Sequence, residues 1–419
     1  MTEPVVITGI GVVSPVGIGA SEHWRSTLAG HSAIGPIRRF DATGYPTRLA
    51  GEVPDFSARA HVPGPVLPQT DHWTHMGLTA AQLGLADARL DPADVSPYRM
   101  AVITASGSGG AEFGQREIQS LWSKGPEHVT AYQSIAWFYA ASTGQISIRH
   151  GMKGPCGVLV TEQAGGLDVL GQACRLLNDS DTDVVLAGGT EAPLSPYGLI
   201  CQVVSGRLST DPDPAHAYRP FESDAGGHVP GEGGAMFVLE RAGDARRRGV
   251  RPGAEVLGYA ATFDPPPGSV RPPALRRAIE GALADAGVAA GDIDAVFADA
   301  VGLPDLDRIE LAALAEVFDG RSVPITAPKT MTGRLSAGGA ALDVATAALA
   351  LRDSVIPPTV GVRAPALPED IWLVRDRPHP ARLRTVLIVA RGFGGFNAAL
   401  VLGAPRGSQE RTTNGDNHG

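Results

Sequence analysis

The spacing of apolar residues and glycines predicts strands that turn directly into helices, and Gly157–Leu177 shows this pattern most clearly. Gly157–Thr161 is a short apolar run of the kind that forms a buried strand. After the paired glycines Gly165 and Gly166, apolar residues recur at helical spacing as far as Leu177. We therefore expect a strand, a tight turn and a helix with one face in the core.

The tight turn of this segment places Gln163 where many enzymes carry a nucleophile. A strand that turns sharply into a helix holds the turn residue at the edge of the sheet, where the helix N-terminus stabilises negative charge. Such a turn lowers the pKa of a cysteine thiol and offers N–H groups to an oxyanion. An amide forms hydrogen bonds but cannot form a thioester. The local pattern is therefore typical of a catalytic site, but its nucleophile is missing.

Two further apolar runs lead to expectations about strand layout. Val5–Thr8 is a β-branched run followed by Gly9 and Gly11, which predicts a strand that ends in a loop at those glycines. This glycine spacing lacks the third glycine of a dinucleotide-binding loop, so we expect a structural turn and no nucleotide. Asp183–Leu186 reads as a second buried strand, expected to lie beside the strand that begins at Gly157.

A helix is predicted to begin near Ala111, because the glycine-rich segment before that residue breaks the chain. Ala111, Gly114, Ile118 and Leu121 fall on one face of this helix. From periodicity alone, we expect that face to pack against a neighbouring element.

The distribution of charged residues divides the chain into two halves. The charged stretch Glu240–Pro252 interrupts the strand pattern, so we place a boundary there between an N-terminal half, residues 1–252, and a C-terminal half, residues 253–404. Residues 405–419 are polar and poor in hydrophobic side chains, which predicts a disordered tail.

The composition of the chain limits which kinds of partner and which cellular compartment we expect. Hydrophobic residues make up 43% and charged residues 19% of the 419 residues, and so low a charged fraction favours burial of surface in an oligomer. The net charge of −9 argues against nucleic acid or an anionic membrane as the main partner. No apolar run reaches the length of a membrane span and no basic signal-peptide region precedes the first strand, so we expect a cytoplasmic protein.

The cysteines and the acidic motifs indicate no metal centre. Cys156, Cys174 and Cys201 show no metal-ligand spacing and no CxxC pair, so we expect reduced thiols that pack in the core. The acidic segment DAVGLPDLDRIE matches no EF-hand loop and holds no histidine. We therefore expect solvated loop acids and a helix cap in that segment.

Five motifs spread along nearly the whole chain resemble the ketosynthase branch of the thiolase superfamily. In order they are VVITGIGVVSPVG, GGTEA, RPFESDAGGHVPGEGGA, PKTMTG and GFGGFNAALVL. The resemblance implies a five-layered α/β/α/β/α fold, built from two similar halves that each contain a mixed sheet. It also implies dimers that pair through central strands.

The resemblance also assigns the active-site positions. In active members the turn carries a cysteine nucleophile, and two histidines assist decarboxylation and condensation. Here Gln163 matches the cysteine, Asp299 the first histidine and Arg334 the second. Lys329, one of only three lysines in the chain, and Phe393 of the GFGG turn are retained. Aspartate and arginine cannot donate the neutral-imidazole hydrogen bond that polarises a thioester carbonyl, so we expect no condensation by this chain alone.

Three more segments, VTEQAGGLD, FDPPPGSVRP and FADAVGLPDLDR, are similar to the chain length factor, the ketosynthase beta subunit of bacterial type II aromatic polyketide synthases. This similarity implies a heterodimer with a catalytic ketosynthase alpha subunit, which elongates a poly-β-keto chain tethered to an acyl carrier protein. It implies no cofactor for the chain itself, because the phosphopantetheine arm belongs to the carrier.

The similarity further implies a role for the helix that begins near Ala111. In chain length factors, the positions matched by Ala111, Gly114 and Ile118 line and close the polyketide tunnel, and bulky aromatic residues there stop the growing chain early. Here those positions are mostly small. A comparatively long polyketide is therefore expected.

Two other functions remain open from the sequence. A self-sufficient acyltransferase would need a displaced nucleophile, but Cys156 precedes the strand, Cys174 lies on the apolar helix face, and no G-x-S-x-G motif occurs. Alternatively, the amide of Gln163 takes part in malonyl decarboxylation by polarising the thioester carbonyl. The competing interpretation is that Gln163 only packs in a vestigial pocket.

Overall fold

The computed structural model describes residues 3–179 and 181–405. In this part of the chain a 12-stranded mixed sheet has the hydrogen-bonded order β13-β11-β10-β15-β16-β9-β1-β8-β7-β5-β6, with β2 (Gly17–Ile18) paired to β1. The strands of the N-terminal half are β1 (Val5–Ser14), β5 (Met100–Ala105), β6 (Cys156–Leu159), β7 (Val184–Glu191) and β8 (Gly233–Arg241). The strands of the C-terminal half are β9 (Ala254–Phe263), β10 (Ala295–Phe297), β11 (Val323–Thr326), β13 (Ile371–Leu373), β15 (Thr385–Arg391) and β16 (Phe396–Gly403). Two small sheets pair β3 (Ile34–Pro36) with β4 (Leu49–Gly51) and β12 (Val355–Ile356) with β14 (His379–Pro380).

The two halves repeat one strand pattern. In the first half β1 is antiparallel to β8 and β8 to β7, while β7, β5 and β6 are parallel. In the second half β9 is antiparallel to β16 and β16 to β15, while β15, β10 and β11 are parallel. The two sets of strands meet where β1 pairs with β9. The predicted two similar halves with mixed sheets are therefore confirmed.

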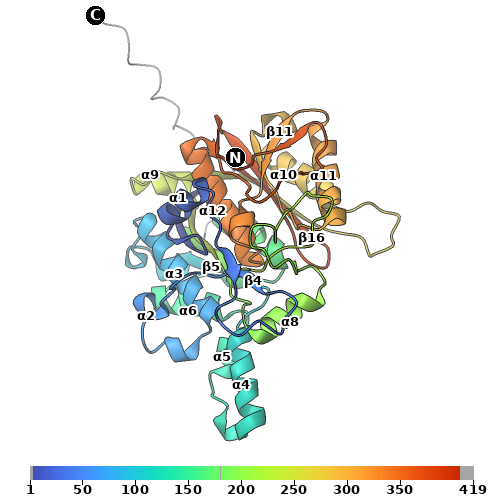
Figure 1. The fold of residues 1–419 in the computed structure, drawn as a ribbon. Coiled ribbons are helices and arrows are strands. Elements are labelled where there is room, and N and C mark those ends of the chain that lie inside the picture. The colour runs from blue at the N-terminus through green and yellow to red at the C-terminus, as the bar shows by residue number, and fades with distance from the viewer. Residues whose placement is uncertain (1–2, 180, 406–419) are drawn as a thin grey trace, which may run out of the picture.

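Helices form three layers around these strands (Figure 1). Helix α3 (His72–Asp87) covers the outer face of the first half, and α10 (Leu275–Ala286) with α11 (Pro304–Phe318) covers the outer face of the second. Helices α7 (Gly165–Asn178) and α12 (Ala337–Asp353) lie between the halves and contact each other. The resulting order of layers is the predicted α/β/α/β/α.

The remaining α-helices lie around this body. They are α1 (Ala20–Leu28), α2 (Ala58–His61), α4 (Ala111–Lys124), α5 (Gln133–Ala136), α6 (Ala141–His150), α8 (Pro196–Val204) and α9 (Ala242–Arg247).

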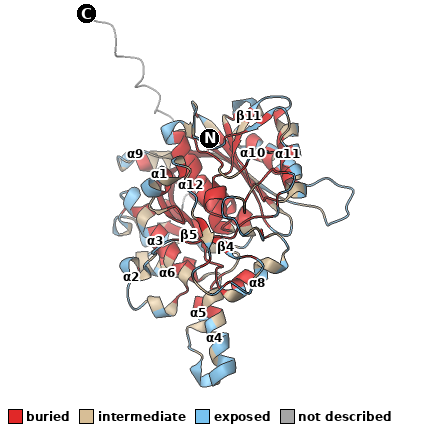
Figure 2. Ribbon diagram, in the orientation of Figure 1, coloured by how far each residue is buried: buried red, intermediate tan, exposed pale blue. Residues whose placement is uncertain are grey.

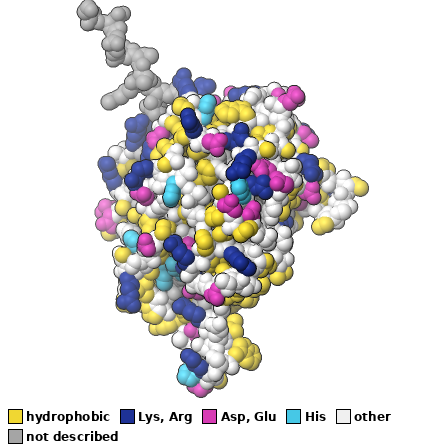
Figure 3. All heavy atoms as spheres, viewed as in Figure 1, with side chains coloured by type: hydrophobic (Ala, Val, Ile, Leu, Met, Phe, Trp, Pro, Cys, Tyr) yellow, Lys and Arg dark blue, Asp and Glu magenta, His cyan; other side chains and the backbone are white. Residues whose placement is uncertain are grey.

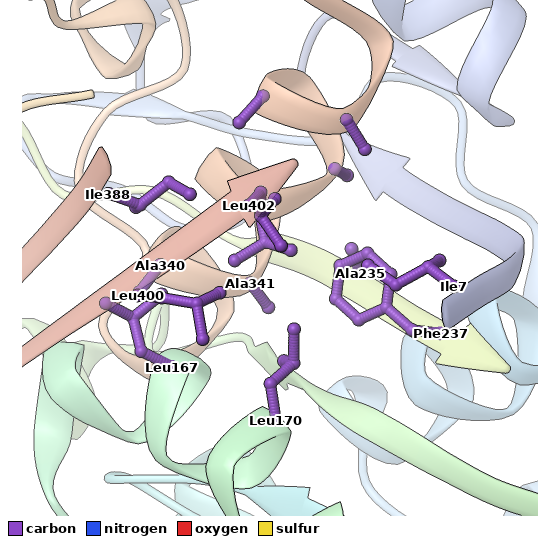
Figure 4. Packing of buried hydrophobic residues seen from close by; sticks show 14 of the residues in the cluster. Ile7, Leu167, Leu170, Ala235, Phe237, Ala340, Ala341, Ile388, Leu400 and Leu402 are labelled. Atoms are coloured by element: carbon purple, nitrogen blue, oxygen red, sulfur yellow. The ribbon is translucent and has the colours of Figure 1, made fainter. Parts of the chain in front are cut away.

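The largest hydrophobic cluster lies in the middle layer. Figure 4 shows side chains from α7, α12 and strands of both halves pointing into it, among them Leu170, Phe237 and Leu400. Helix α12 is buried along almost its whole length, and its small residues let it approach its neighbours closely. A Cβ atom added at Gly166 of α7 would overlap the backbone of Ala341 in α12, so the two helices meet backbone to backbone.

Strand β1 continues past its predicted end and through Gly9 and Gly11, so the predicted loop at those glycines was wrong. A Cβ atom at either position would collide with the backbone of α3, at Gly84 or Ala80. The two glycines therefore let a helix pack closely on the strand rather than turn the chain.

The predicted position of the strand at Asp183–Leu186, beside the strand that begins at Gly157, was also wrong. Strand β7 does not pair with β6, because β5 lies between them and pairs with both. Strand β6 is consequently the last strand at its end of the sheet, and Cys156 on it is exposed. Periodicity identifies a buried strand but does not say which other strand it pairs with.

Helices α4 and α5 project from the body (Figure 1), and we call residues 111–136 the α4 projection. Helix α4 begins at Ala111, as predicted. Gly114 is buried, and a Cβ atom added there would lie 3.6 Å from the Cβ of Trp137. The rest of the helix is largely exposed (Figure 2), and 50% of Ile118 is accessible to solvent.

The predicted boundary after residue 252 lies in the loop between α9 and β9. The predicted disordered tail spans residues 405–419, and all of it except Pro405 lies outside the described residues. Across residues 3–179 and 181–405, no helix is long and apolar enough to cross a membrane. The same residues contain no group of three or more His, Cys, Asp or Glu side chains placed to hold a metal ion.

Candidate functional site

The segment from β6 to α7 forms the predicted succession of strand, turn and helix. The strand runs from Cys156 to Leu159 and none of its residues is buried, so the predicted burial was wrong, because β6 lies at the edge of the sheet. The turn is a single 3-10 turn, Glu162–Ala164, that continues directly into α7. Glu162 has a φ of 52°, a left-handed conformation that is uncommon for a residue with a side chain. We call this turn the elbow. It places Gln163 in the interior, where none of its surface is exposed.

The amide of Gln163 is buried without a polar partner. Neither Nε2 nor Oε1 accepts or donates a hydrogen bond among the described residues. The side chain instead lies against the start of α12, where a Cβ atom added at Gly339 would be 2.8 Å from Nε2. An unsatisfied buried polar group costs about 1–3 kcal/mol, so Gln163 contributes polarity to the site at the expense of stability.

Asp299 and Arg334, which replace the two expected histidines, form a buried ion pair. Arg334 Nη2 lies 2.9 Å from Oδ1 and 3.1 Å from Oδ2 of Asp299, and Nη1 donates to the Asp299 carbonyl oxygen at 3.0 Å. Arg334 Nη2 also donates to the carbonyl oxygen of Arg391 at 2.6 Å, while the Arg391 N–H donates to Asp299 Oδ1 at 2.9 Å. Burial lowers the pKa of Arg334, but the charge interactions with Asp299, Glu162 and Tyr218 and the hydrogen bond to Asp299 together outweigh burial and raise that pKa above its usual value.

The carboxylates behind this pair were missed from the sequence. Glu310 of α11 accepts the N–H groups of Asp299 at 2.7 Å and Ala300 at 2.9 Å, and Asp307 accepts those of Gly302 at 3.0 Å and Phe221 at 2.8 Å. Burial, reinforced by the negative charge of Asp299, raises the pKa of Glu310 to about 7. The expectation of solvated loop acids was therefore wrong for Asp299, Asp307 and Glu310, because the acidic segment folds inward and its carboxylates accept backbone N–H groups.

Lys329 is buried and donates a hydrogen bond to the backbone next to Asp299. Its Nζ lies 2.8 Å from Oδ2 of Asp343 on α12 and donates to the carbonyl oxygen of Ala298, the residue before Asp299. Burial raises the pKa of Asp343, although the ammonium group of Lys329 opposes this shift. Lys329 therefore ties α12 to the end of β10.

A cavity of about 390 Å³ opens above the elbow. Its lining includes Glu162, Cys201, Arg207, His228, Arg334 and Phe393. We call it the Phe393 cavity. Phe393 is 53% exposed, its N–H donates to Oε2 of Glu162 at 2.9 Å, and the Arg207 guanidinium lies 4.5 Å from its ring centroid. Burial and the positive charges of Arg334 and Arg207 lower the pKa of His228 to about 3, so its ring is neutral.

The positions predicted to line a tunnel lie on the neighbouring α4 projection. The loop before α4 contacts the elbow, because a Cβ atom at Gly107 would lie 3.6 Å from the Cα of Glu162. Glu191 fixes this loop by accepting N–H groups from Gly107 and Ser108. Burial raises the pKa of Glu191 to about 7. Helix α4, which carries Ala111, Gly114 and Ile118, projects from the body (Figure 1).

The thiols occupy different surroundings from those predicted. Cys156 and Cys201 are exposed, so core packing was wrong for both. Cys174 is largely covered within α7, where burial raises the pKa of its thiol to about 12. Cys201 lines the Phe393 cavity but lies in the second half of α8, away from a helix N-terminus. None of the three occupies the elbow, where a thiolate would be stabilised.

We expect that Arg334→Leu destabilises the protein by about 3–5 kcal/mol, because it leaves the carboxylate of Asp299 buried without its partner. The double variant Asp299→Asn/Arg334→Leu should recover part of this loss. Urea unfolding midpoints measure both effects. Arg308→Leu, which removes an exposed ion pair to Asp305, is the control and should change little. A loss at Arg334 no larger than this control would contradict a stabilising role for the buried pair.

Comparison with known proteins agrees with this arrangement. Residues 2–245 match the beta-ketoacyl synthase N-terminal domain and residues 253–363 match the beta-ketoacyl synthase C-terminal domain. The chain is 57% identical to the tetracenomycin polyketide synthase ketoacyl synthase beta subunit of Streptomyces glaucescens, over 95% of this chain and 98% of that protein.

Solved structures show the same fold. The ishigamide ketosynthase/chain length factor matches with a TM-score of 0.88 and 29% identity, over 97% of this chain and 100% of that one. A type II polyketide synthase acyl-carrier protein in complex with its ketosynthase bound to the hexaketide matches with a TM-score of 0.86 and 25% identity, over 97% and 100% of the two chains. The chain therefore belongs to the beta-ketoacyl synthase family, in its branch of polyketide synthase ketosynthase beta subunits, the chain length factors.

Proposed function

We propose that this chain is the non-condensing subunit of a heterodimeric ketosynthase, in which it completes the polyketide tunnel and sets the length of the poly-β-keto chain. The observation that carries the proposal is the state of the three reaction positions. Gln163 cannot form a thioester, and Asp299 and Arg334 neutralise each other in a buried ion pair. Condensation then depends on a partner alpha subunit that supplies the cysteine.

The surface supports a large apolar interface with that partner. Exposed hydrophobic side chains lie on the α4 projection, where Figure 3 shows hydrophobic side chains at the surface, just after it in the sequence, and on segments next to the edge strand β6. They are Ile118, Leu121, Trp122, Ile135, Trp137, Phe138, Ile148 and Val160. Strand β6 also has no partner on its outer side among the described residues. Contiguous apolar surface and a free strand edge are features that proteins normally cover by association.

The remaining parts of the proposal concern the substrate, the carrier and the compartment. The growing chain is tethered to an acyl carrier protein, whose phosphopantetheine arm makes a cofactor of this subunit's own unnecessary. A solved relative contains a carrier protein together with its ketosynthase, which supports this partner.

The exposed thiols of Cys156 and Cys201 suit a reducing compartment, so we place the complex in the cytoplasm.

One observation favours a second function. Both polar atoms of the Gln163 amide are buried and unpaired, so Nε2 can donate to a thioester carbonyl that reaches the elbow. In this second candidate function, Gln163 polarises that carbonyl while malonyl loses carbon dioxide. Replacement of Gln163 by Ala would then slow chain initiation, measured as release of carbon dioxide from malonyl carrier protein.

Gln163→Cys is expected not to restore condensation, because the activating imidazoles are still replaced by Asp299 and Arg334. The assay pairs this variant with an alpha subunit whose own nucleophilic cysteine is changed to Ala, so that any product must come from the new thiol. Product analysis together with mass spectrometry of the acylated chain is the readout. Efficient chain extension by this complex would contradict the proposed non-condensing role.

The isolated chain is expected to be inactive and prone to aggregation, because an obligate interface of about 2,000–5,000 Å² would leave apolar surface exposed. Co-expression with the alpha subunit should give a 1:1 complex by gel filtration. Trp122→Glu, at a side chain that is 81% exposed, should weaken the complex at least about tenfold, equivalent to 1.4 kcal/mol. Val270→Glu, on a fully exposed loop of the C-terminal half, is the control. A soluble, condensing monomer would refute the heterodimer.

Ala111→Phe is expected to shorten the product, because an aromatic side chain would fill space at the start of α4. Gly114→Phe is a less clean test, since it must first displace Trp137. Overpacking commonly costs about 1–3 kcal/mol, so complex formation is checked before product mass is compared. Arg277→Phe, on the exposed side of α10, is the control. An intact Ala111→Phe complex that makes wild-type product would show that this position does not set chain length.

A further inference from the structure

The base of α4 is fixed to the body by a polar cluster that the proposed function does not use. Glu112, in the first turn of α4, forms an ion pair with Arg39. Arg39 also donates from Nη1 to Nε2 of His72 at 2.8 Å and from Nε to the carbonyl oxygen of Leu194 at 3.3 Å. Glu232, which is 1% exposed, lies 3.5 Å from Nη1 of the same guanidinium. Arg39 therefore holds Glu112 against groups that belong to the body of the protein.

A second anchor reaches the backbone of α4 at the next residue. Asp71 caps α3 by accepting the N–H of Trp73 through Oδ1 at 3.1 Å, and its Oδ2 accepts the N–H of Phe113 at 2.6 Å. Asp71 is 1% exposed and Phe113 is 5% exposed. One buried carboxylate thus joins the N-terminus of α3 to the first turn of α4.

Beyond this base, α4 makes a hydrogen bond to α8 of the body and a hydrogen bond within its own projection. Gln115 accepts the N–H of Tyr197 of α8 at 2.8 Å, but Glu117 accepts the N–H of Thr130 at 2.6 Å, which lies within the projection. A helix rises about 1.5 Å per residue, so a tilt of about 10° at Glu112 moves Ile118 by about 1.6 Å, close to the length of one carbon–carbon bond. The direction of the first turn therefore sets the position of the residues farther along.

We infer that Arg39 and Asp71 are positioning residues for chain length: by fixing Glu112 and the Phe113 backbone, they set the direction of α4 and thereby where the tunnel ends. This inference rests on the proposed function, because it requires that α4 border the tunnel. It adds that the uniformity of product length depends on a polar anchor outside the tunnel. Loosening the anchor should give products of several lengths, whereas filling the tunnel should give a single, shorter product.

The test compares Glu112→Ala and Asp71→Asn with Glu117→Ala in the reconstituted heterodimer. Glu117 lies on the same helix, but its carboxylate is bound within the projection, so Glu117→Ala is a matched control. We expect the first two variants to assemble, to keep total product within about twofold of wild type, and to raise the share of products one or two ketide units away at least about threefold. Amide hydrogen exchange at residues 113–118 should be faster in both, and unchanged in Glu117→Ala.

The possible results distinguish a failure of the anchor inference from a failure of the proposed function. If the anchor variants make the single wild-type product while Ala111→Phe still shortens it, the anchor inference is wrong and the proposed function stands. If Ala111→Phe also leaves the product unchanged, α4 does not border the tunnel and both fail. If the anchor variants lose assembly, or lose total product without a change in its distribution, Arg39 and Asp71 hold the fold or the complex rather than the tunnel, and the inference is overturned.

Discussion

The close contact between α7 and α12 is the constraint on which the rest of the structure depends. Both helices lie between the two halves, and glycine at position 166 lets their backbones meet. Because the elbow leads directly into α7, this contact also fixes Gln163 against Gly339 at the start of α12. A larger residue at either glycine would separate the layers or displace the amide. The contact between α7 and α12 therefore determines both the packing of the core and the geometry of the site.

The buried charges of the site inside this frame are paired. A buried charge is tolerated only when it is paired, and Arg334 satisfies Asp299 while also donating to the backbone of Arg391. Lys329 is paired with Asp343 in the same way. These contacts leave no free imidazole, thiolate or ammonium group at the reaction positions among the described residues. Gln163 differs from these paired side chains, since its amide is polar and buried but has no hydrogen-bond partner.

The surface of the protein differs from this site, because it leaves apolar side chains and a strand edge uncovered. The α4 projection and the outer edge of β6 expose apolar side chains and a free strand edge, which suits a subunit whose surface is completed by a partner. The projection is nevertheless fixed at its base, where Glu112 and the Phe113 backbone bind groups of the body. A helix that is anchored at one end and apolar at its surface can border a cavity that neither subunit encloses alone.

The sequence by itself determined the local elements and the loss of the nucleophile. Apolar spacing and paired glycines were sufficient to predict the strand, the turn and the helix around Gln163, because these patterns follow from the geometry of short segments. Family motifs added the five layers and the positions of Asp299, Arg334 and Lys329. The tunnel positions Ala111, Gly114 and Ile118 stay predictions, because no contact within this chain tests whether they border a tunnel.

Only the tertiary structure decided which groups meet. Periodicity could not place β5 between β6 and β7, nor show that Gly9 and Gly11 face a helix rather than form a turn. It could not reveal that Asp299 and Arg334, 35 residues apart, neutralise each other, or that Glu310 turns inward. The physical reason is that pairing, burial and charge compensation depend on distances in space, whereas a sequence pattern records only which face of a single element is apolar.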